Sequence, residues 1–270
     1  MFTYGFNFSI DFKGGTITEA SYVSRPEKAE LESSIQKLDI GGFSVRPSGD
    51  KNFIIRTKEL SEEERVGLLK TLGATTIERQ NTIGPSAGAE LQGKAVKAIA
   101  VVILMIVLFI TFAFRKVSKP VASWKYGLAT IIALAHDVVI PTGVFVYLGH
   151  TLGYEIDLLF ITGLLAILGY SVHDTIVVFD RVRENLMDTA NLSNGEFENV
   201  VGKSVQQTFG RSINTSVTIF ITLLALYIYG SSATASFALL LIVGLIAGTY
   251  SSIFVASPLL VTFVRLQKSK

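Results

Sequence analysis

From residue 94 onward the chain consists of long apolar runs separated by short connectors. A bilayer core of about 30 Å needs roughly 20 apolar residues in a helix. Five segments meet this requirement, at residues 95–114, 127–148, 158–179, 213–229 and 237–264. This pattern predicts a polytopic α-helical membrane protein with about five transmembrane helices. The last run is long enough to tilt, or to bend at Gly244, Gly248 or Pro258.

The overall composition agrees with a membrane protein. Of the 270 residues, 49% are hydrophobic and only 17% are charged, against about 25% charged residues in a typical soluble domain. A net charge of +2 gives no reason to expect nucleic acid. The chain has no cysteine, and the histidines at 136, 150 and 173 lack HExxH-like spacing. We therefore expect no metal site and no cofactor.

Charge divides the chain near Gly93. Residues 1–93 hold 11 Lys and Arg against 13 Asp and Glu, a net of −2, whereas residues 94–270 hold 13 against 9, a net of +4. The first part has the composition of a globular domain, and the second part contains all five apolar runs. Two domains, 1–93 and 94–270, are therefore expected.

The connectors between the runs predict the orientation, since short cytoplasmic loops are rich in Lys and Arg. Basic residues occur in the first connector, the third connector and the tail, which predicts that these three are cytoplasmic; they are Arg115, Lys116, Lys119, Lys125, Arg181, Arg183, Lys203, Arg211, Arg265, Lys268 and Lys270. The second and fourth connectors contain neither Lys nor Arg. The N-terminal domain is accordingly expected outside the cytoplasm and the C-terminus inside.

An outward N-terminal domain needs a preceding signal to cross the membrane. Residues 1–6 have no charged start and no apolar run of sufficient length. We therefore expect that an earlier helix is missing from this chain, which would bring the native count to six.

The N-terminal domain alternates between strand and helix patterns. Strands are predicted at 16–23, 43–46, 52–57 and 75–83, and helices at 24–38 and 61–72. Ser24 with Glu27, and Ser61 with Glu64, have capping-box spacing. The order β-α-β-β-α-β is the split βαβ, ferredoxin-like arrangement. The domain lacks Gly-rich phosphate loops and clustered acids, so binding or mechanical coupling is expected rather than catalysis, and the chain is not expected to be an enzyme.

Two carboxyl groups fall at membrane depth. Asp137 lies near the middle of the second run, and Asp174 lies six residues before the cytoplasmic end of the third, about 9 Å deep at 1.5 Å per residue. Such groups often mark proton or ion pathways. Arg211, at the start of the fourth run, is the counter-charge expected for Asp174. Hydrogen-bonding support is expected from Ser171, Thr175, Asn214 and Thr215.

A static polar cluster is the alternative interpretation, because Ser, Thr, Asn and His commonly bond helices together in membranes. Asp137 is the weaker relay candidate of the two carboxyls. His136 and His173 each neighbour an aspartate in sequence and so point to different helix faces, which favours packing or hydrogen bonding over relay. Gly244 and Gly248 form a small-xxx-small motif, which predicts close helix contact within or between chains.

Four segments resemble the SecF family of bacterial protein-export subunits. They are FNFSIDFKGGT at 6–16, GYSVHDTIVVFDRVREN at 169–185, GRSINTSVTIFITLL at 210–224 and GLIAGTYSSIFVASPLL at 244–260, with a weaker fifth, IGPSAGAEL, at 83–91. The first segment also occurs in the sister subunit SecD, but the compact N-terminal domain is similar to that of SecF alone.

The resemblance implies a mechanism. Proteins of this family pair with SecD in a proton-driven complex similar to the resistance–nodulation–division transporters. They assist the SecYEG channel in the bacterial cytoplasmic membrane by acting on the emerging preprotein at the outer face. The essential carboxyl of the family falls on Asp174 and its membrane arginine on Arg211. His173 replaces the usual asparagine, and so is a further candidate for altering the relay. The resemblance also implies a first helix absent here.

Two other functions remain open. One is a small-molecule or ion transporter of the same superfamily, against which the short outward domain argues. The other is a scaffold that only stabilises the channel complex, against which Asp174 and Arg211 argue.

Overall fold

A computed structural model describes residues 5–115, 122–187 and 194–268. It divides into two compact units. The α/β unit comprises Phe6–Val96 together with Glu155–Leu158, and the helical unit comprises the described residues within 97–154 and 159–268. The division at Val96 falls inside a continuous helix. Three residues of the predicted cytoplasmic connectors, Lys116, Lys119 and Lys270, lie outside the described residues.

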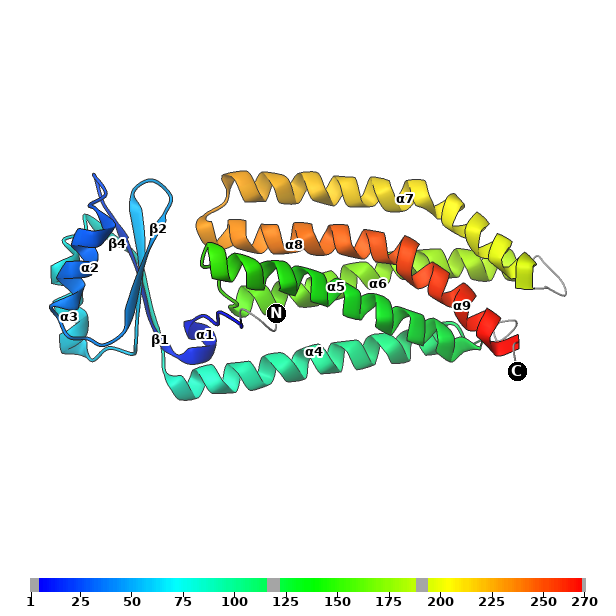
Figure 1. Cartoon of the computed structure of the whole chain (residues 1–270), viewed down its shortest axis with the longest axis horizontal. Coiled ribbons are helices and arrows are strands. Elements are labelled where there is room, and N and C mark those ends of the chain that lie inside the picture. The colour runs from blue at the N-terminus through cyan, green and yellow to red at the C-terminus, as the bar shows by residue number, and fades with distance from the viewer. Residues whose placement is uncertain (1–4, 116–121, 188–193, 269–270) are drawn as a thin grey trace. The chain divides into compact units, whose positions relative to one another are not determined.

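The α/β unit is a ferredoxin-like fold, as its sequence predicts. Its elements are α1 (Ile10–Lys13), β1 (Gly15–Ser21), α2 (Lys28–Gln36), β2 (Phe43–Ser48), β3 (Asn52–Thr57), α3 (Glu62–Leu72) and β4 (Thr76–Ile83). The strands form one antiparallel sheet in the order β2-β3-β1-β4, and α2 and α3 cover one face of it (Figure 1). Ile35, Phe53, Ile55 and Leu68 are buried between these two layers.

One of the two predicted capping boxes is present. Glu64 donates its backbone N–H to Ser61 Oγ at 3.2 Å, and Ser61 donates its N–H to Glu64 Oε2 at 2.8 Å, so α3 starts as predicted. The box predicted at Ser24 is wrong, because α2 begins at Lys28 and its N-cap Glu27 makes no side-chain cap bond. Pro26 explains the difference, since a proline disfavours helical geometry in the residue before it.

The helical unit contains the membrane spans. Its helices are α4 (Pro85–Ala113), α5 (Ser123–Thr151), α6 (Leu158–Met187), α7 (Asn194–Tyr229), α8 (Ser232–Ser251) and α9 (Ser257–Lys268), with a π-helix, η1 (Ser252–Ala256), between the last two. Among the described residues five continuous helical stretches are long and apolar enough to cross a membrane, α8, η1 and α9 forming one of them. The predicted class, a polytopic membrane protein with a small α+β domain, is confirmed. Helix α7 begins well before the predicted fourth run, so Arg211 lies inside a helix.

Glycine allows α6 and α8 to approach closely. A Cβ atom on Gly248 would lie 3.1 Å from Ser171 Cβ, and one on Gly244 would collide with the side chain of Ile167. The small-xxx-small motif therefore packs against α6 of the same chain. This close approach lets side chains of α6 and α8 bond to one another in the interior.

The bend in the last span comes from the π-helix. Pro258 cannot donate a backbone N–H to the preceding turn, and a π-bulge accommodates such a position without leaving the helix. Ser257 Oγ donates to the carbonyl oxygen of Ser252 at 2.9 Å, which satisfies one acceptor in this turn. Of the three bend positions considered, Pro258 lies nearest to the irregular turn, which ends two residues earlier at Ala256.

Candidate functional site

Asp137 is at the centre of a polar cluster inside the helical unit. It lies on α5 with no exposed surface. Its Oδ2 accepts hydrogen bonds from Ser171 Oγ on α6 and, at 2.7 Å, from Ser251 Oγ at the end of α8. Its Oδ1 lies 2.8 Å from Nδ1 of His136. Both oxygens of this carboxyl thus have partners, which fits a structural group that holds three helical segments together.

Asp174 on α6 has a different environment. It is 8% exposed, and its Oδ1 accepts a hydrogen bond from Ser212 Oγ of α7 at 2.6 Å. Its Oδ2 is buried without a hydrogen-bond partner among the described residues. An unpaired buried polar atom is costly, and one in a native structure needs an explanation. Of the two carboxyls, Asp174 is therefore the one with a buried oxygen that lacks a hydrogen-bond partner in the described structure.

Hydroxyl pairs continue the cluster along the helices. Thr175 Oγ1 lies 2.9 Å from Ser252 Oγ, so the π-helix contacts α6 next to Asp174. Ser216 Oγ on α7 lies 3.1 Å from the Tyr170 hydroxyl and 2.6 Å from Thr249 Oγ1. Polar side chains from α5, α6, α7, α8 and η1 therefore meet in the interior of the bundle.

The sequence-predicted residues do not all meet at Asp174. Ser171 bonds to Asp137, and Thr175 bonds to Ser252. The other four, His173, Arg211, Asn214 and Thr215, are exposed in this chain. Among the described residues no ion pair joins Arg211 to Asp174, although Arg211 immediately precedes Ser212, the residue that bonds this carboxyl.

Sequence reasoning missed three serines of the polar cluster, two of which bond to the carboxyls. Ser212 donates to Asp174, and Ser251 donates to Asp137. Ser252 pairs with Thr175. Serine in a membrane helix usually bonds back to its own turn, so its presence alone carries little information. The signal available was their position, since Ser212 and the Ser251–Ser252 pair lie within two of the motif segments.

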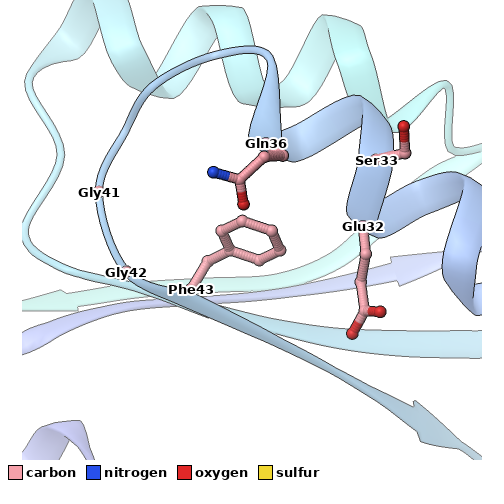
Figure 2. A pocket seen from close by; sticks show the side chains of 6 residues that line it. All are labelled: Glu32, Ser33, Gln36, Gly41, Gly42 and Phe43. Carbon is pink, nitrogen blue, oxygen red and sulfur yellow. The ribbon is translucent and has the colours of Figure 1, made fainter.

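The α/β unit contains an open depression with a volume of about 700 Å³. Figure 2 shows Gln36 of α2 beside the ring of Phe43 at the start of β2, with Glu32 and Ser33 from the same helix and Gly41 and Gly42 in the loop. Glu32 is the one titratable group in this lining. No group of three or more His, Cys, Asp or Glu positioned to bind a metal occurs in the described part of the chain.

A ferredoxin-like domain attached to a helical bundle with two buried carboxyls defines a membrane protein of the kind that moves substrates or ions. The family model described as "Protein export membrane protein SecD/SecF, C-terminal" matches residues 66–266, and the SecD/SecF GG motif matches residues 1–23. The chain belongs to the SecD/SecF protein-export family.

Its relatives include subunits of the SecF type. Protein translocase subunit SecF of Thermobaculum terrenum is 38% identical, over 96% of this chain and 85% of the relative. SecF of Anaerolinea thermophila is 36% identical, over 97% and 85%. The crystal structure of SecDF from Thermus thermophilus, described as translocon-associated, superposes with a TM-score of 0.81 at 34% identity, covering 100% of this chain and 35% of that one. The chain thus matches about a third of that SecDF protein.

Proposed function

We propose that this chain is an accessory subunit of the Sec export machinery that, together with SecD, couples the proton gradient to preprotein movement. The preprotein would be pulled or held at the outer face as it leaves the SecYEG channel. Family membership supports the export role, and the fused SecDF relative supports a partnership with SecD. In this role the chain performs no covalent chemistry, and it would reside in the bacterial cytoplasmic membrane.

The contrast between the two buried carboxyls supports proton coupling at Asp174. Asp137 has hydrogen-bonding groups at both oxygens, whereas one oxygen of Asp174 has none in the described structure. Asp174 has one hydroxyl within hydrogen-bonding geometry, that of Ser212, and the Ser252 hydroxyl is close by. A buried carboxylate with so few donors is poorly solvated, and the neutral acid suits such a site better. Asp174 is thus suited to bind a proton here and to release it when a further donor or cation arrives.

Arg211 is the proposed cation. It is exposed on the helix that also carries Ser212, one residue away from the bond to Asp174. Adjacent residues of an α-helix lie about 100° apart around its axis. A rotation of α7 by part of this angle, together with reorientation of the long Arg211 side chain, would exchange the hydroxyl contact for a guanidinium contact. The ionised form of Asp174 would then be stabilised, and the proton would leave.

The exposed polar side chains of α7 support the proposal that a second protein covers this helix. Only 6% of the most apolar stretch of α7 is buried within this chain. Asn214 and Thr215 on this helix are exposed, and ionisable or amide groups that face lipid are costly. A second protein that covers this face would satisfy them. SecD, which is part of the same chain in the fused relative, is the proposed occupant.

The orientation proposed from the basic connectors places the α/β unit outside and the C-terminus in the cytoplasm. Among described residues, Arg181 and Arg183 lie near the end of α6 and Arg265 lies near the end of α9, as this orientation requires. The α/β unit would then stand on the side where the preprotein emerges.

Replacement of Asp174 by Asn tests the proposal. Asparagine keeps the size and the hydrogen bond but cannot titrate. Complexes of the wild type and Asp174→Asn with SecD and SecYEG should be compared at equal abundance for export with and without an imposed proton gradient. We expect Asp174→Asn to abolish the stimulation by the gradient while assembly survives. Wild-type stimulation in this variant would leave only a scaffold role.

A further inference from the structure

Residues 7–15 contact the first turns of α4 and the first residue of α6. The first turns of α4 and the first residue of α6, Leu158, belong to the α/β unit, as does the connector Glu155–Leu158. The contacts described next all lie within that unit. The GG-motif segment therefore connects a folded domain to the beginnings of two spans.

Three hydrogen bonds hold the beginning of α6. Phe8 and Ile156 form a parallel bridge, in which the Ser9 N–H donates to the Ile156 carbonyl at 3.0 Å and the Ile156 N–H donates to the Asn7 carbonyl at 2.9 Å. Asp11 Oδ2 accepts the backbone N–H of Leu158 at 3.0 Å. A carboxylate at this position satisfies a free N–H of the first turn and interacts favourably with the helix dipole.

Glycines let the beginning of α4 pack closely against residues 7–15. Gly14 has a φ of 78°, and a Cβ atom there would lie 2.8 Å from the Pro85 Cα. A Cβ atom on Gly88 would lie 3.0 Å from the backbone nitrogen of Gly14. Residues 7–15 and the IGPSAGAEL segment at 83–91 are therefore in backbone-to-backbone contact, which explains why both contain glycine.

A largely buried ion pair connects the sheet to the connector Glu155–Leu158. Arg56 of β3 and Glu155 approach to 2.9 Å between Nε and Oε2, and their side chains are only 19% and 12% exposed. Arg46, Asp157 and Lys13 are the other charged groups near Glu155. Burial raises the pKa of the Glu155 carboxyl, against the opposing effect of Arg56. Arg56 Nε and Nη1 both lack a hydrogen bond of good geometry among the described residues, so the pair is held by charge attraction, which charge reversal can disrupt.

We propose that residues 7–15 with Arg56 and Glu155 form a joint that transmits movement of α6 to the sheet of the α/β unit, with Asp11, Arg56 and Glu155 as positioning residues. This inference rests on the proposed function, because α6 is the helix that carries Asp174. Asp174 lies 16 residues after Leu158, about 24 Å along the helix. An axial shift of α6 caused by protonation would pull on the Asp11 bond and on the paired connector.

The joint is tested in the full chain assembled with SecD and SecYEG, by the ratio of preprotein export with a proton gradient to export without one. Asp11→Ala removes the acceptor for Leu158, whereas Asp11→Asn keeps an oxygen there. Arg56→Glu and Glu155→Arg each reverse one charge, and the double variant restores the pair. We expect Asp11→Ala and each single reversal to lower the ratio roughly threefold or more, as a lost helix cap shifts a two-state equilibrium. Asp11→Asn and the double reversal should recover it.

The Lys58–Glu64 pair supplies a matched control. It spans 3.1 Å in the same unit but is 56% and 31% exposed, so Lys58→Glu should leave the ratio unchanged. Wild-type ratios in Asp11→Ala and both single reversals would overturn the joint, as would losses that are equal with and without the gradient. The Asp174→Asn arm separates the two proposals: if it abolishes the response and the joint variants do not, only the joint fails.

Amide hydrogen exchange provides a second measurement. Exchange at Leu158 should be faster in Asp11→Ala than in the wild type, and Asp11→Asn should resemble the wild type. Equal exchange in all three proteins would contradict the cap on α6.

Discussion

Ser251 at the end of α8 donates a hydrogen bond of 2.7 Å to Asp137 of α5, across 114 residues of sequence. The next residue, Ser252, begins the π-helix and pairs with Thr175 of α6. Two adjacent serines thus connect the irregular turn to two different helices. Both oxygens of Asp137 have hydrogen-bonding partners, so we expect this carboxyl to keep its position.

We predict that Asp137 is needed for stability more than for proton coupling. Asp137→Leu removes the acceptor of Ser171, whose buried hydroxyl then lacks its partner at a cost of about 1–3 kcal/mol. Ser251 loses one of its two acceptors and keeps the carbonyl oxygen of Gly248. Its melting temperature in detergent should fall clearly below that of the wild type. Asp137→Asn keeps an acceptor and should affect gradient-driven export less than Asp174→Asn does. Complete loss of the gradient response in Asp137→Asn, at normal stability, would make Asp137 a relay group instead.

The proposed orientation predicts opposite labelling of two positions. The chain has no cysteine, so single cysteines at Ser48 and Ser269 are unique. An impermeant thiol reagent applied to intact cells should label position 48 and not position 269. The reverse pattern would invert the topology.

The α/β unit should fold when expressed alone as residues 1–90, with the circular dichroism of a small α+β domain. Because Ser61 caps α3, Ser61→Ala should lower the free energy of unfolding by about 0.5–2 kcal/mol in urea titration. Ser24→Ala is the matched control, since α2 starts after Glu27 and gains no side-chain cap. Equal losses in the two variants would contradict this assignment of caps.

The buried Glu155 predicts a pH dependence with a definite sign. Its pKa is raised in the folded chain, chiefly by burial, so the folded state binds the proton more tightly than the unfolded state does. The contribution of Glu155 to stability is therefore greatest at low pH, and declines as pH rises from the ordinary value of 4.5 through the raised one. The melting temperature of the wild type, relative to Glu155→Gln, should fall across this window. A difference that grows with pH would contradict the sign.

The sequence is sufficient to predict the four strands, the two main helices of the α/β unit and the five spans, because the evidence for them is local, but not α1, the π-helix or the early start of α7. The apolar runs define the spans, and Ser61 with Glu64 marks the start of α3 through contacts three residues apart. Asp174 could also be singled out, since a carboxyl inside an apolar run is visible without a structure.

The partners of these residues were not predictable in the same way. Asp11 and Leu158 are 147 residues apart, and Ser212 and Asp174 are 38 apart. Such pairings depend on how the helices pack, and the spacing of apolar residues along the sequence does not predict them. Asn214 and Thr215 have the residue types expected near a buried carboxyl, yet their position on α7 turns them outward. Ser24 failed as a cap because a neighbouring proline outweighed the motif.

The π-helix at Ser252–Ala256 also has a consequence for how this span tolerates change in length. A π-turn holds one residue more than an α-turn of the same height, and one residue corresponds to about 100° of rotation. Deleting one residue there would straighten the backbone but turn the face of α9 that carries Leu260 and Val264, both buried, by that angle. If the π-turn moved to another position along the span, the helix between the old and the new position would rotate about its axis. The two ends of the span would keep their depth in the bilayer.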